Sequence, residues 1–395
     1  MVERSAHGGE RQNKGRKRGQ PAQPAGVKTV TTELRTPSAM RSSAHPLRTP
    51  GSEHRHTNHI ARRKPNYAIG EGLGNYLGKH GRRSPLPIAY DDLLRHDGLM
   101  AHRGADGRET LWTTVMLRPS EMEDTRHRLV ELYCILTGGG KPLPHLQVAS
   151  IDFCGFGNSQ PFRVKILNQL NDNHDYYYIK KADASRVYGL ELEHLLSPNK
   201  INYICTGGTL VEEHIIGVPG DDFIKAPERY GGDFNAVRLC KEFVKFNERC
   251  FVRLLGDMRA YNFVVGMVQD FDQVQYRLRS IDFDQQSFEG RHRIYLPQFY
   301  KENLAYVALA REHIGPETAE QYAQEERSLL RKRYQVAAEQ VEELLDVMHG
   351  ERISLTEHVA LLRKELASYH RCADFKRCTT MGEILQMQLR VMLDL

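Results

Sequence analysis

The sequence is poor in the features that mark several protein classes. Its seven cysteines are scattered among 395 residues and form no Cys-X-X-Cys pair. This argues against a zinc site or a disulfide framework and favours buried or free thiols in a reducing compartment. No apolar run approaches the roughly 18 residues of a membrane-spanning helix. The first residues include Glu3 and lack the apolar stretch of a secretory signal. We therefore expect a cytoplasmic protein with no membrane span.

Positive charge is concentrated at the start of the chain. Residues 1–64 contain 14 Lys and Arg and four Glu, a net charge of +10, whereas the whole chain carries +5, so residues 65–395 carry −5. This segment has few large apolar side chains and cannot bury enough surface to offset its ordering entropy. We predict a disordered basic tail. It could contact a polyanion through KGRKRG at 14–19 and ARRK at 61–64, although a solvated tail is the simpler interpretation.

Hydrophobic periodicity divides the remaining chain into three parts. Residues 65–145, with a β-rich stretch at 110–117, are either an accessory region or an extra layer of an N-terminal lobe. Residues 146–216 are dense in predicted strands, at 146–153, 162–167, 176–180, 203–205 and 209–216, with one helical pattern over 185–196. Residues 217–395 are mainly helical, with short strands at 263–268 and 276–283. A strand-rich part followed by a helix-rich part predicts an α+β fold with two lobes.

A glycine-containing segment separates the first two strands of the strand-rich part. In CGFGNSQPF, Gly155 and Gly157 would allow backbone N–H groups, together with Asn158 and Ser159, to approach a phosphate closely. Taken alone, GFGNS is more typical of an ordinary hairpin turn. The next strand, YYYIKK, ends in two lysines, and a lysine there could pair with phosphate oxygens.

One carboxylate of the helical pattern falls on its expected buried face. Glu191 lies among apolar side chains, and a buried carboxylate needs a cation. Lys180 is the expected partner. Lys181 in place of Lys180, and Glu193 in place of Glu191, remain open as alternatives.

Two further motifs contain oxygen ligands and a candidate base. In GDMRAYN, Asp257 and Asn262 have the spacing of a catalytic loop in which Asp accepts the proton of an attacking hydroxyl and Asn holds a metal. Further along, RSIDFDQQ places Asp282 at the end of a strand, where its hard carboxylate oxygens suit Mg²⁺. Asp and Asn in loops most often make turns. The two motifs in this order are more specific than either alone.

These motifs in this order resemble the protein-kinase-like superfamily. The resemblance covers about residues 148–310 and is closest to the atypical bacterial branch, with aminoglycoside-phosphotransferase-like, lipopolysaccharide-kinase-like and HipA-like members. It implies an antiparallel-sheet N-lobe over 146–216, preceded by the region 65–145, and a helical C-lobe with a C-terminal extension over 217–395. The third motif of the family reads DFG or DFD, and Asp284 matches the second form.

The resemblance also implies roles for individual residues. Residues 155–159 would cover the nucleotide, Lys180 would pair with its phosphates, and Glu191 would be the helix partner of that lysine. LVEEHI at 210–215, with Glu212, Glu213 and Ile215, would run along the adenine edge as the hinge between lobes. Asp257 would be the catalytic base, while Asn262 and Asp282 would bind metal. Leu255 and Arg259 depart from the family pattern, and Arg259 could hold the transferred phosphate or an acidic substrate.

The implied function is an ATP- and Mg²⁺-dependent phosphotransferase that moves the γ-phosphate to a hydroxyl of a small molecule or protein. Two alternatives belong to other classes. The chain could be a catalytically inactive pseudokinase-type regulatory or scaffold protein, or a polyanion-binding protein acting through residues 1–64. Retention of every base and metal position favours catalysis, since a scaffold has no physical need of them.

Overall fold

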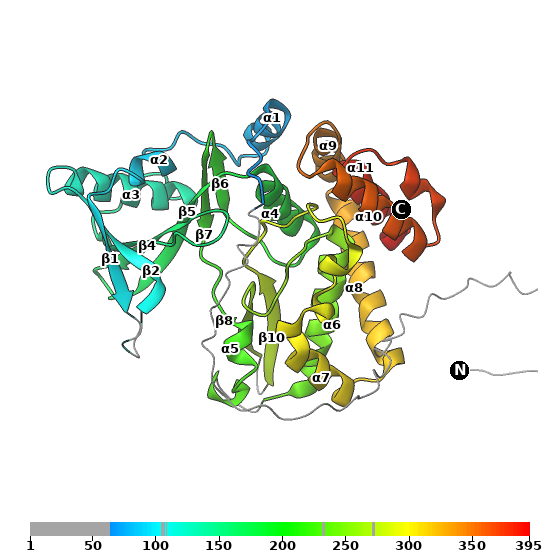
Figure 1. Ribbon diagram of the computed structural model, residues 1–395. Helices are drawn as coiled ribbons and strands as arrows, with labels where there is room; N and C mark the ends of the chain where they lie inside the picture. Colours follow the sequence, from blue (N-terminus) through cyan, green and yellow to red (C-terminus); the bar gives the residue numbers. More distant parts are fainter. Residues whose placement is uncertain (1–63, 104–106, 108, 231–233, 271–272) are drawn as a thin grey trace, which may run out of the picture. The chain divides into compact units, whose positions relative to one another are not determined.

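A computed structural model describes residues 64–103, 107, 109–230, 234–270 and 273–395 (Figure 1). These residues belong to one unit that spans residues 45–395. The predicted basic tail, residues 1–64, and its predicted polyanion contact lie outside the described residues, except for Lys64. The ammonium of Lys64 forms an ion pair with Asp183, with 2.7 Å between Nζ and Oδ1.

The described strand-rich part folds into an antiparallel sheet of seven strands in the order β1-β2-β3-β4-β5-β7-β6. The strands span Gly98–Arg103 (β1), Glu109–Met116 (β2), Leu146–Phe153 (β3), Phe162–Asn168 (β4), His174–Lys181 (β5), Tyr203–Thr206 (β6) and Thr209–Glu213 (β7). The strands predicted up to residue 205 are confirmed to within two residues, whereas the one predicted over 209–216 ends at Glu213. Residues 65–145 thus supply two strands to the same sheet.

Along the central strands β4 and β5, buried and more exposed side chains alternate, and the buried ones lie on one face of the sheet. Val164 of β4 and Ile179 of β5 are buried on one face, together with Leu129 of α3 (Met122–Leu136). The short helix α2 (Tyr90–Leu93) contributes to the same cluster. The hydroxyl of Tyr177 donates to the carbonyl of Leu129 (2.8 Å), which fixes α3 on β5. One face of the sheet is therefore covered by α2 and α3 (Figure 1).

The helix-rich part forms a second hydrophobic cluster around a small sheet of order β10-β9-β8. Its strands span Val218–Pro219 (β8), Phe263–Asp270 (β9) and Gln273–Ser280 (β10), and its helices span Gly220–Phe223 (α5), Ala236–Arg253 (α6), Leu304–His313 (α7), Pro316–Val336 (α8), Ala338–His349 (α9), Thr356–Tyr369 (α10) and Met381–Leu393 (α11). Short 3₁₀ turns span Pro227–Tyr230, His292–Tyr295, Pro297–Phe299, Lys301–Asn303 and Ala373–Arg377. Together with the seven-stranded sheet, these elements confirm the α+β class.

Helix α4 (Ala184–Leu196) follows β5 directly but packs in the cluster of the helix-rich part. The Asp183 side chain caps it by accepting from the backbone N–H of Arg186 (3.3 Å). A Cβ at Gly189 would lie 3.0 Å from the Cβ of Phe283, so glycine allows α4 to approach the 283–286 segment closely. Helix α1 (Glu71–Lys79) packs on α9. Helix α4 therefore belongs to the helix-rich cluster, although it follows a strand of the seven-stranded sheet.

The sequence predicts neither a disulfide framework nor a membrane-spanning helix. All seven cysteines are free, and five of them are buried. None of the described helices combines the length and apolar character needed to cross a membrane.

Candidate functional site

The predicted lysine lies in a buried ion network at the junction of β5, β7 and α4. The ammonium of Lys180 pairs with Glu212, with 2.7 Å between Nζ and Oε2, and both side chains are buried. Tyr178 of β5 lies directly opposite Glu212 of β7 in the sheet. Lys180 is two residues from Tyr178 and therefore projects from the same face of the sheet as Glu212.

The predicted ion pair between Lys180 and Glu191 is wrong. Glu191 is fully buried and accepts hydrogen bonds from the hydroxyls of Tyr203 (2.5 Å) and Tyr76 (3.2 Å). It also accepts from Arg82 Nε (3.2 Å) and from Gln340 Nε2 (3.0 Å). Its side chain therefore faces α1 and α9, because the helix turns it away from β5.

The alternative partners do not form this pair either. Glu193 pairs with Arg253 and accepts from Ser197 Oγ (2.6 Å). Lys181 is exposed on the face of β5 opposite to Lys180, where it lines a cavity of about 500 Å³ beside α1. The structure thus distinguishes Lys180 from Lys181, and it replaces both candidate glutamates with Glu212.

Arg186, the third residue of α4, connects Glu212, the partner of Lys180, to Asp282 and Asp284 of the RSIDFDQQ segment. Its Nε and Nη2 donate to the two carboxylate oxygens of Glu212 (2.5 and 2.9 Å). Its Nη1 donates to Oδ1 of Asp282 and to Oδ1 of Asp284, each at 2.9 Å. We call Lys180, Arg186, Glu212, Asp282 and Asp284 the ion network.

The sequence contained a signal for this arginine that our interpretation did not use. Arg186 lies four residues before Leu190 and seven before Glu193, which is helical spacing on one face. An arginine in line with a buried leucine must find carboxylates inside the protein. The identity of those carboxylates, however, depends on the neighbouring strand and loop.

Burial and the charges within the ion network together shift the pKa values of its members. Burial would raise the pKa of Glu212, but the charges of Arg186 and Lys180 outweigh burial and lower this pKa to about 2. Burial and the neighbouring Arg186 lower the pKa of Lys180, while Glu212 opposes the shift. Burial and the adjacent Asp284 raise the pKa of Asp282. When all five side chains are ionised, three carboxylates surround two cations and leave one negative charge in excess.

The GDMRAYN loop presents Asp257 in an unusual backbone conformation. Asp257 has a φ of +57°, in the left-handed region that a non-glycine residue occupies at a cost. Its backbone carbonyl accepts from Asn262 Nδ2 (2.7 Å), which closes the loop. Its carboxylate pairs with Arg259, with 2.7 Å between Nε and Oδ1, and Arg259 Nη1 reaches Glu302 Oε1 at 3.3 Å. Burial raises the pKa of Asp257, and the ion pair with Arg259 opposes the increase.

The structure brings the two predicted oxygen-ligand motifs together. The backbone N–H of Ile281 donates to the carbonyl of Asn262 (3.0 Å), so Asn262 and Asp282 lie in adjacent segments. Asp282 Oδ1 is held by Arg186 Nη1 and by the N–H of Asp284 (3.1 Å). Among the described contacts, Asp282 Oδ2 has no hydrogen-bond partner. That oxygen, on a side chain about 35% exposed, is the one a further ligand can reach.

The glycine-containing loop between β3 and β4 folds against the end of β5. The carbonyl of Ser159 accepts from the backbone N–H of Lys181 (3.3 Å), and that of Gln160 accepts from the Tyr90 hydroxyl (3.0 Å). Gly157 has a φ of +82°, which explains the glycine at this turn. Gly155 and Asn158 are exposed. The loop is therefore hydrogen-bonded to Lys181, the residue that follows Lys180.

Most of the segment predicted as a hinge, residues 210–215, belongs to strand β7. Glu212 and Glu213 belong to β7, which pairs with β5 on one side and β6 on the other, so their backbones have no free edge. The Glu212 side chain lies in the ion network instead of along an adenine edge, and Glu213 Oε2 accepts from Asn202 (2.9 Å). The connection between β7 and β8 is 214–217, and Ile215 is buried within it. Ile215 therefore lies in the connection between the two sheets, whereas Glu212 and Glu213 do not.

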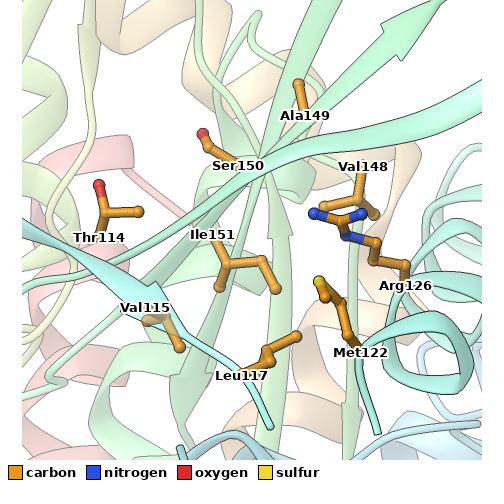
Figure 2. Close-up of a pocket in the computed structure, with 9 residues that line it drawn as sticks. All are labelled: Thr114, Val115, Leu117, Met122, Arg126, Val148, Ala149, Ser150 and Ile151. Atoms are coloured by element: carbon orange, nitrogen blue, oxygen red, sulfur yellow. The ribbon is translucent and has the colours of Figure 1, made fainter. Parts of the chain in front are cut away.

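A smaller cavity lies away from these residues, between β2, β3 and the start of α3 (Figure 2). The two strands pair at Thr113–Phe153 and Thr114–Asp152, and β3 has a register shift against β4 between Val148 and Ser150, beside the cavity. The space, about 120 Å³, is lined by side chains that include Arg126. It shares no lining residue with the ion network or with the GDMRAYN loop.

The arrangement can bind an anion near the glycine-containing loop and a cation near Asp282. In the described part of the chain, no group of three His, Cys, Asp or Glu side chains is placed to hold a metal by itself. A complete protein cage is not required for Mg²⁺, which usually takes one or two carboxylates and completes its shell with water and substrate phosphates. No family model and no curated protein sequence matches this chain.

Proposed function

We propose that the chain has a protein-kinase-like fold and is an ATP- and Mg²⁺-dependent phosphotransferase that moves the γ-phosphate to a hydroxyl acceptor. One observation carries the proposal. The ion network connects Lys180 to Asp282, and the segment before Asp282 is hydrogen-bonded to Asn262, which closes the loop of Asp257. A lysine, a candidate base and two oxygen ligands are thus connected through direct contacts, as phosphoryl transfer requires.

The donor atoms around Asp282 fit a magnesium ion. The ion network has one carboxylate more than it has cations, and the second oxygen of Asp282 is not used by Arg186 or by Asp284. The hydrogen bonds of Asn262 use its Nδ2, so Oδ1 is the atom that a metal would take. When bound with the nucleotide, Mg²⁺ would neutralise charge that develops on the phosphate oxygens.

The chain's own residues would position the reactants. The 155–159 loop would bring backbone N–H groups to the phosphates, and Lys180 would share its ammonium between Glu212 and a phosphate oxygen. Asp257 would accept the proton of the acceptor hydroxyl, a step assisted by the raised pKa of its carboxylate. Because Arg259 holds this carboxylate, it would orient the base and face the acceptor.

A second function is favoured by a specific observation. Asp282 and Asp257 each already have an arginine partner, Arg186 and Arg259 respectively. In a non-catalytic protein of the same fold, Arg186 would take the place of the metal permanently. The chain would then act as a regulatory or scaffold protein. This alternative predicts that nucleotide binding, if present, does not depend on Mg²⁺.

Ligand-induced stabilisation separates the two proposals. The melting temperature of the full chain is measured with ATP, with ATP plus Mg²⁺, and with Mg²⁺ alone, because a ligand of the native state raises the midpoint. We expect a Mg²⁺-dependent increase in the wild type that is lost in Asp282→Asn. Asp97→Asn removes an exposed carboxylate paired with Arg118 and serves as the control, in which the increase should persist. An increase with ATP alone that survives in Asp282→Asn would favour the non-catalytic alternative, and no increase with any of the three ligand conditions would contradict the phosphotransferase proposal.

Catalysis is tested by the turnover of ATP to ADP and phosphate, with water as the acceptor. We expect Asp257→Asn to lower the rate by about 10²- to 10⁴-fold, which is the usual contribution of general-base catalysis. The Mg²⁺-dependent increase in melting temperature should remain in this variant, because Asp257 is not assigned to the nucleotide. Equal turnover in the wild type and Asp257→Asn would contradict the assignment of the base.

A further inference from the structure

A single row of side chains crosses all seven strands on the sheet face opposite α2 and α3. Strand register aligns each member with the next from β1 to β6. In order, the row is Met100, Thr114, Asp152, Arg163, Tyr178, Glu212 and Tyr203. At one end α4 covers the row and the ion network begins, whereas at the other end Met100 is 57% exposed. The α2–α3 layer covers the other side of the sheet. On this side, most of the described side chains between Tyr178 and Met100 are half-buried or exposed, and we call this the uncovered part of the face.

Cations and aromatic rings alternate on the uncovered part of this face. The guanidinium of Arg163 lies 4.4 Å from the ring centroid of Trp112 and 5.5 Å from that of Tyr176. The ammonium of Lys165 lies 5.8 Å from the ring centroid of Tyr176. The rings come from β2 and β5 and the cations from β4, so the contacts depend on the sheet. We call Trp112, Arg163, Lys165, Tyr176 and Tyr178 the aromatic face.

The aromatic face is held in place by contacts on both sides. Arg163 donates to Oδ2 of the buried Asp152 through Nε (3.3 Å) and Nη2 (2.9 Å), which fixes the plane of its guanidinium. The Tyr178 hydroxyl is hydrogen-bonded to Nδ1 of His214 (3.1 Å), whose ring also contacts Tyr176 at 5.6 Å. Burial lowers the pKa of His214, so its ring is neutral near pH 7. All five members of the aromatic face are half-buried, so each still presents a surface.

We propose that the aromatic face binds single-stranded nucleic acid. Unpaired bases stack on aromatic side chains without regard to sequence, and interleaved cations contact the phosphates. Asp152 is buried and neutralised by Arg163, and Lys165 has no ion-pair partner among the described residues. The accessible charge of the face is therefore positive. The +10 charge of residues 1–64 in the sequence adds to the attraction for a polyanion.

The expected ligand is single-stranded because the aromatic face needs base surfaces that are free to stack. In a duplex, the bases already stack on one another, so only the phosphate contacts would remain. The proposal does not depend on phosphotransfer. The aromatic face shares no residue with the ion network or with the GDMRAYN loop. Its nearest approach is Tyr178, whose ring centroid lies 5.3 Å from Nζ of Lys180.

The chain provides its own probe for this test. Trp112 is the only tryptophan in the sequence, so fluorescence excited selectively at tryptophan, and not at tyrosine, reports on the aromatic face. The full chain is titrated with oligouridylate and with oligothymidylate of about 12 nucleotides, a length within the usual range for one binding fold. We expect saturable quenching of Trp112 by both oligonucleotides and weaker binding as salt increases. A duplex of the same length should cause little quenching.

Matched variants separate the aromatic face from non-specific binding. In an anisotropy assay with a labelled oligonucleotide, Tyr176→Ala and Lys165→Ala should each raise Kd about tenfold. Tyr322 and Lys241 form a comparable cation–ring pair on α8 and α6, at 4.5 Å, and Tyr322→Ala and Lys241→Ala should leave Kd unchanged. Melting curves establish that each variant is folded.

Two outcomes would overturn the proposal. Binding without quenching of Trp112, and with the same Kd in Tyr176→Ala, would place the ligand on the basic residues 1–64 alone. A lack of binding at low salt would exclude nucleic acid as the occupant. Neither outcome affects the Mg²⁺-ATP increase in melting temperature, which reports on Asp282, so failure of this proposal is distinguishable from failure of the phosphotransferase proposal.

Discussion

At the scale of the residue, the centre of this protein is Arg186. Its guanidinium is buried and contacts the carboxylates of Glu212, Asp282 and Asp284. A buried ion pair is weak evidence of stability when compared with apolar residues of the same shape. Loss of one partner is different, because it leaves the remaining charges buried without compensation.

Replacing Arg186 should therefore destabilise the fold strongly. We expect Arg186→Gln to lower the free energy of unfolding by about 3–5 kcal/mol, the usual cost of breaking a buried pair. Arg118→Gln is the control, because Arg118 pairs with Asp97 at the surface and such pairs contribute about 1 kcal/mol or less. Urea denaturation measures both changes. Similar small losses in the two variants would mean that the ion network does not hold the buried segments together.

The acid side of the pH–rate profile should depend on Arg259. The raised pKa of Asp257 means that the base becomes protonated, and turnover falls, at a higher pH than for an ordinary aspartate. Arg259 favours the ionised carboxylate, so Arg259→Gln should raise this pKa further and move the acid limb of kcat to higher pH. Arg293 lies over the ring of Phe299, and Arg293→Gln is the matched control. A limb that stays in place or moves to lower pH in Arg259→Gln would contradict the assignment.

At the scale of the element, the position of α4 decides whether the ion network can form. Arg186 reaches Asp282 and Asp284 because α4 lies close to the segment that follows β10. The Ser185 hydroxyl donates to the carbonyl of Gln286 (2.6 Å), which confirms the close approach. Gly189 provides the space, since an added Cβ would meet Phe283 and Gln286 at 3.0 and 3.1 Å.

Two glycines in helices should therefore respond in opposite directions to alanine. We expect Gly189→Ala to destabilise by about 1–3 kcal/mol, as overpacking does, and to weaken Mg²⁺-ATP stabilisation by displacing Arg186. Gly74 of α1 has no atom within 4 Å of an added Cβ, so Gly74→Ala should be neutral or stabilise by up to about 1 kcal/mol through helix propensity. Thermal denaturation with and without Mg²⁺-ATP measures both effects. Equal responses would indicate that α4 can shift freely.

At the scale of the whole molecule, the described residues contain two separate hydrophobic clusters. One combines one face of the seven-stranded sheet with α2 and α3. The other combines the helix-rich part with α1, α4 and side chains of β6 and β7, including Tyr203 and Leu210. The ion network lies where the clusters meet, since Lys180 comes from a strand of the sheet and Arg186 from α4. Separate cores allow separate local stabilities.

Two spectroscopic probes should consequently report different transitions once one core is weakened. Phe162 is fully buried in the sheet cluster, and Phe162→Ala should cost about 3–5 kcal/mol there. We expect the midpoint of Trp112 fluorescence in urea to fall by more than the midpoint of helical circular dichroism. Leu344→Ala in α9, within the other cluster, is the counterpart and should lower the helical midpoint by more. Coincident transitions in both variants would show that the clusters unfold as one unit.

The prediction of elements from the sequence was close because period-two and helical patterns are local. The strands at 146–153 and 162–167, and the helix over 185–196, lie within one residue of β3, β4 and α4. The loop of Asp257 and Asn262 lies between α6 and β9, as the pattern around it indicates. The strand predicted over 276–283 is wrong by three residues at each end, since β10 spans Gln273–Ser280 and Asp282 follows it. The predicted hinge was too long at its start, since the backbone of Glu213 pairs inside the sheet, and the pattern 209–216 does not reveal where pairing ends.

The partner of Lys180 could not be predicted in the same way. The sequence by itself determined that the chain has a strand-rich part and a helix-rich part, and that Lys180, Asp257, Asn262 and Asp282 lie at the ends of elements or between them. The tertiary structure alone decided which of these side chains meet. Glu212 pairs with Lys180 because β7 lies next to β5 in the sheet, whereas α4 turns Glu191 toward α1 and α9. The order of strands and the rotation of a helix about its axis are set by packing between distant segments, and no local pattern encodes them.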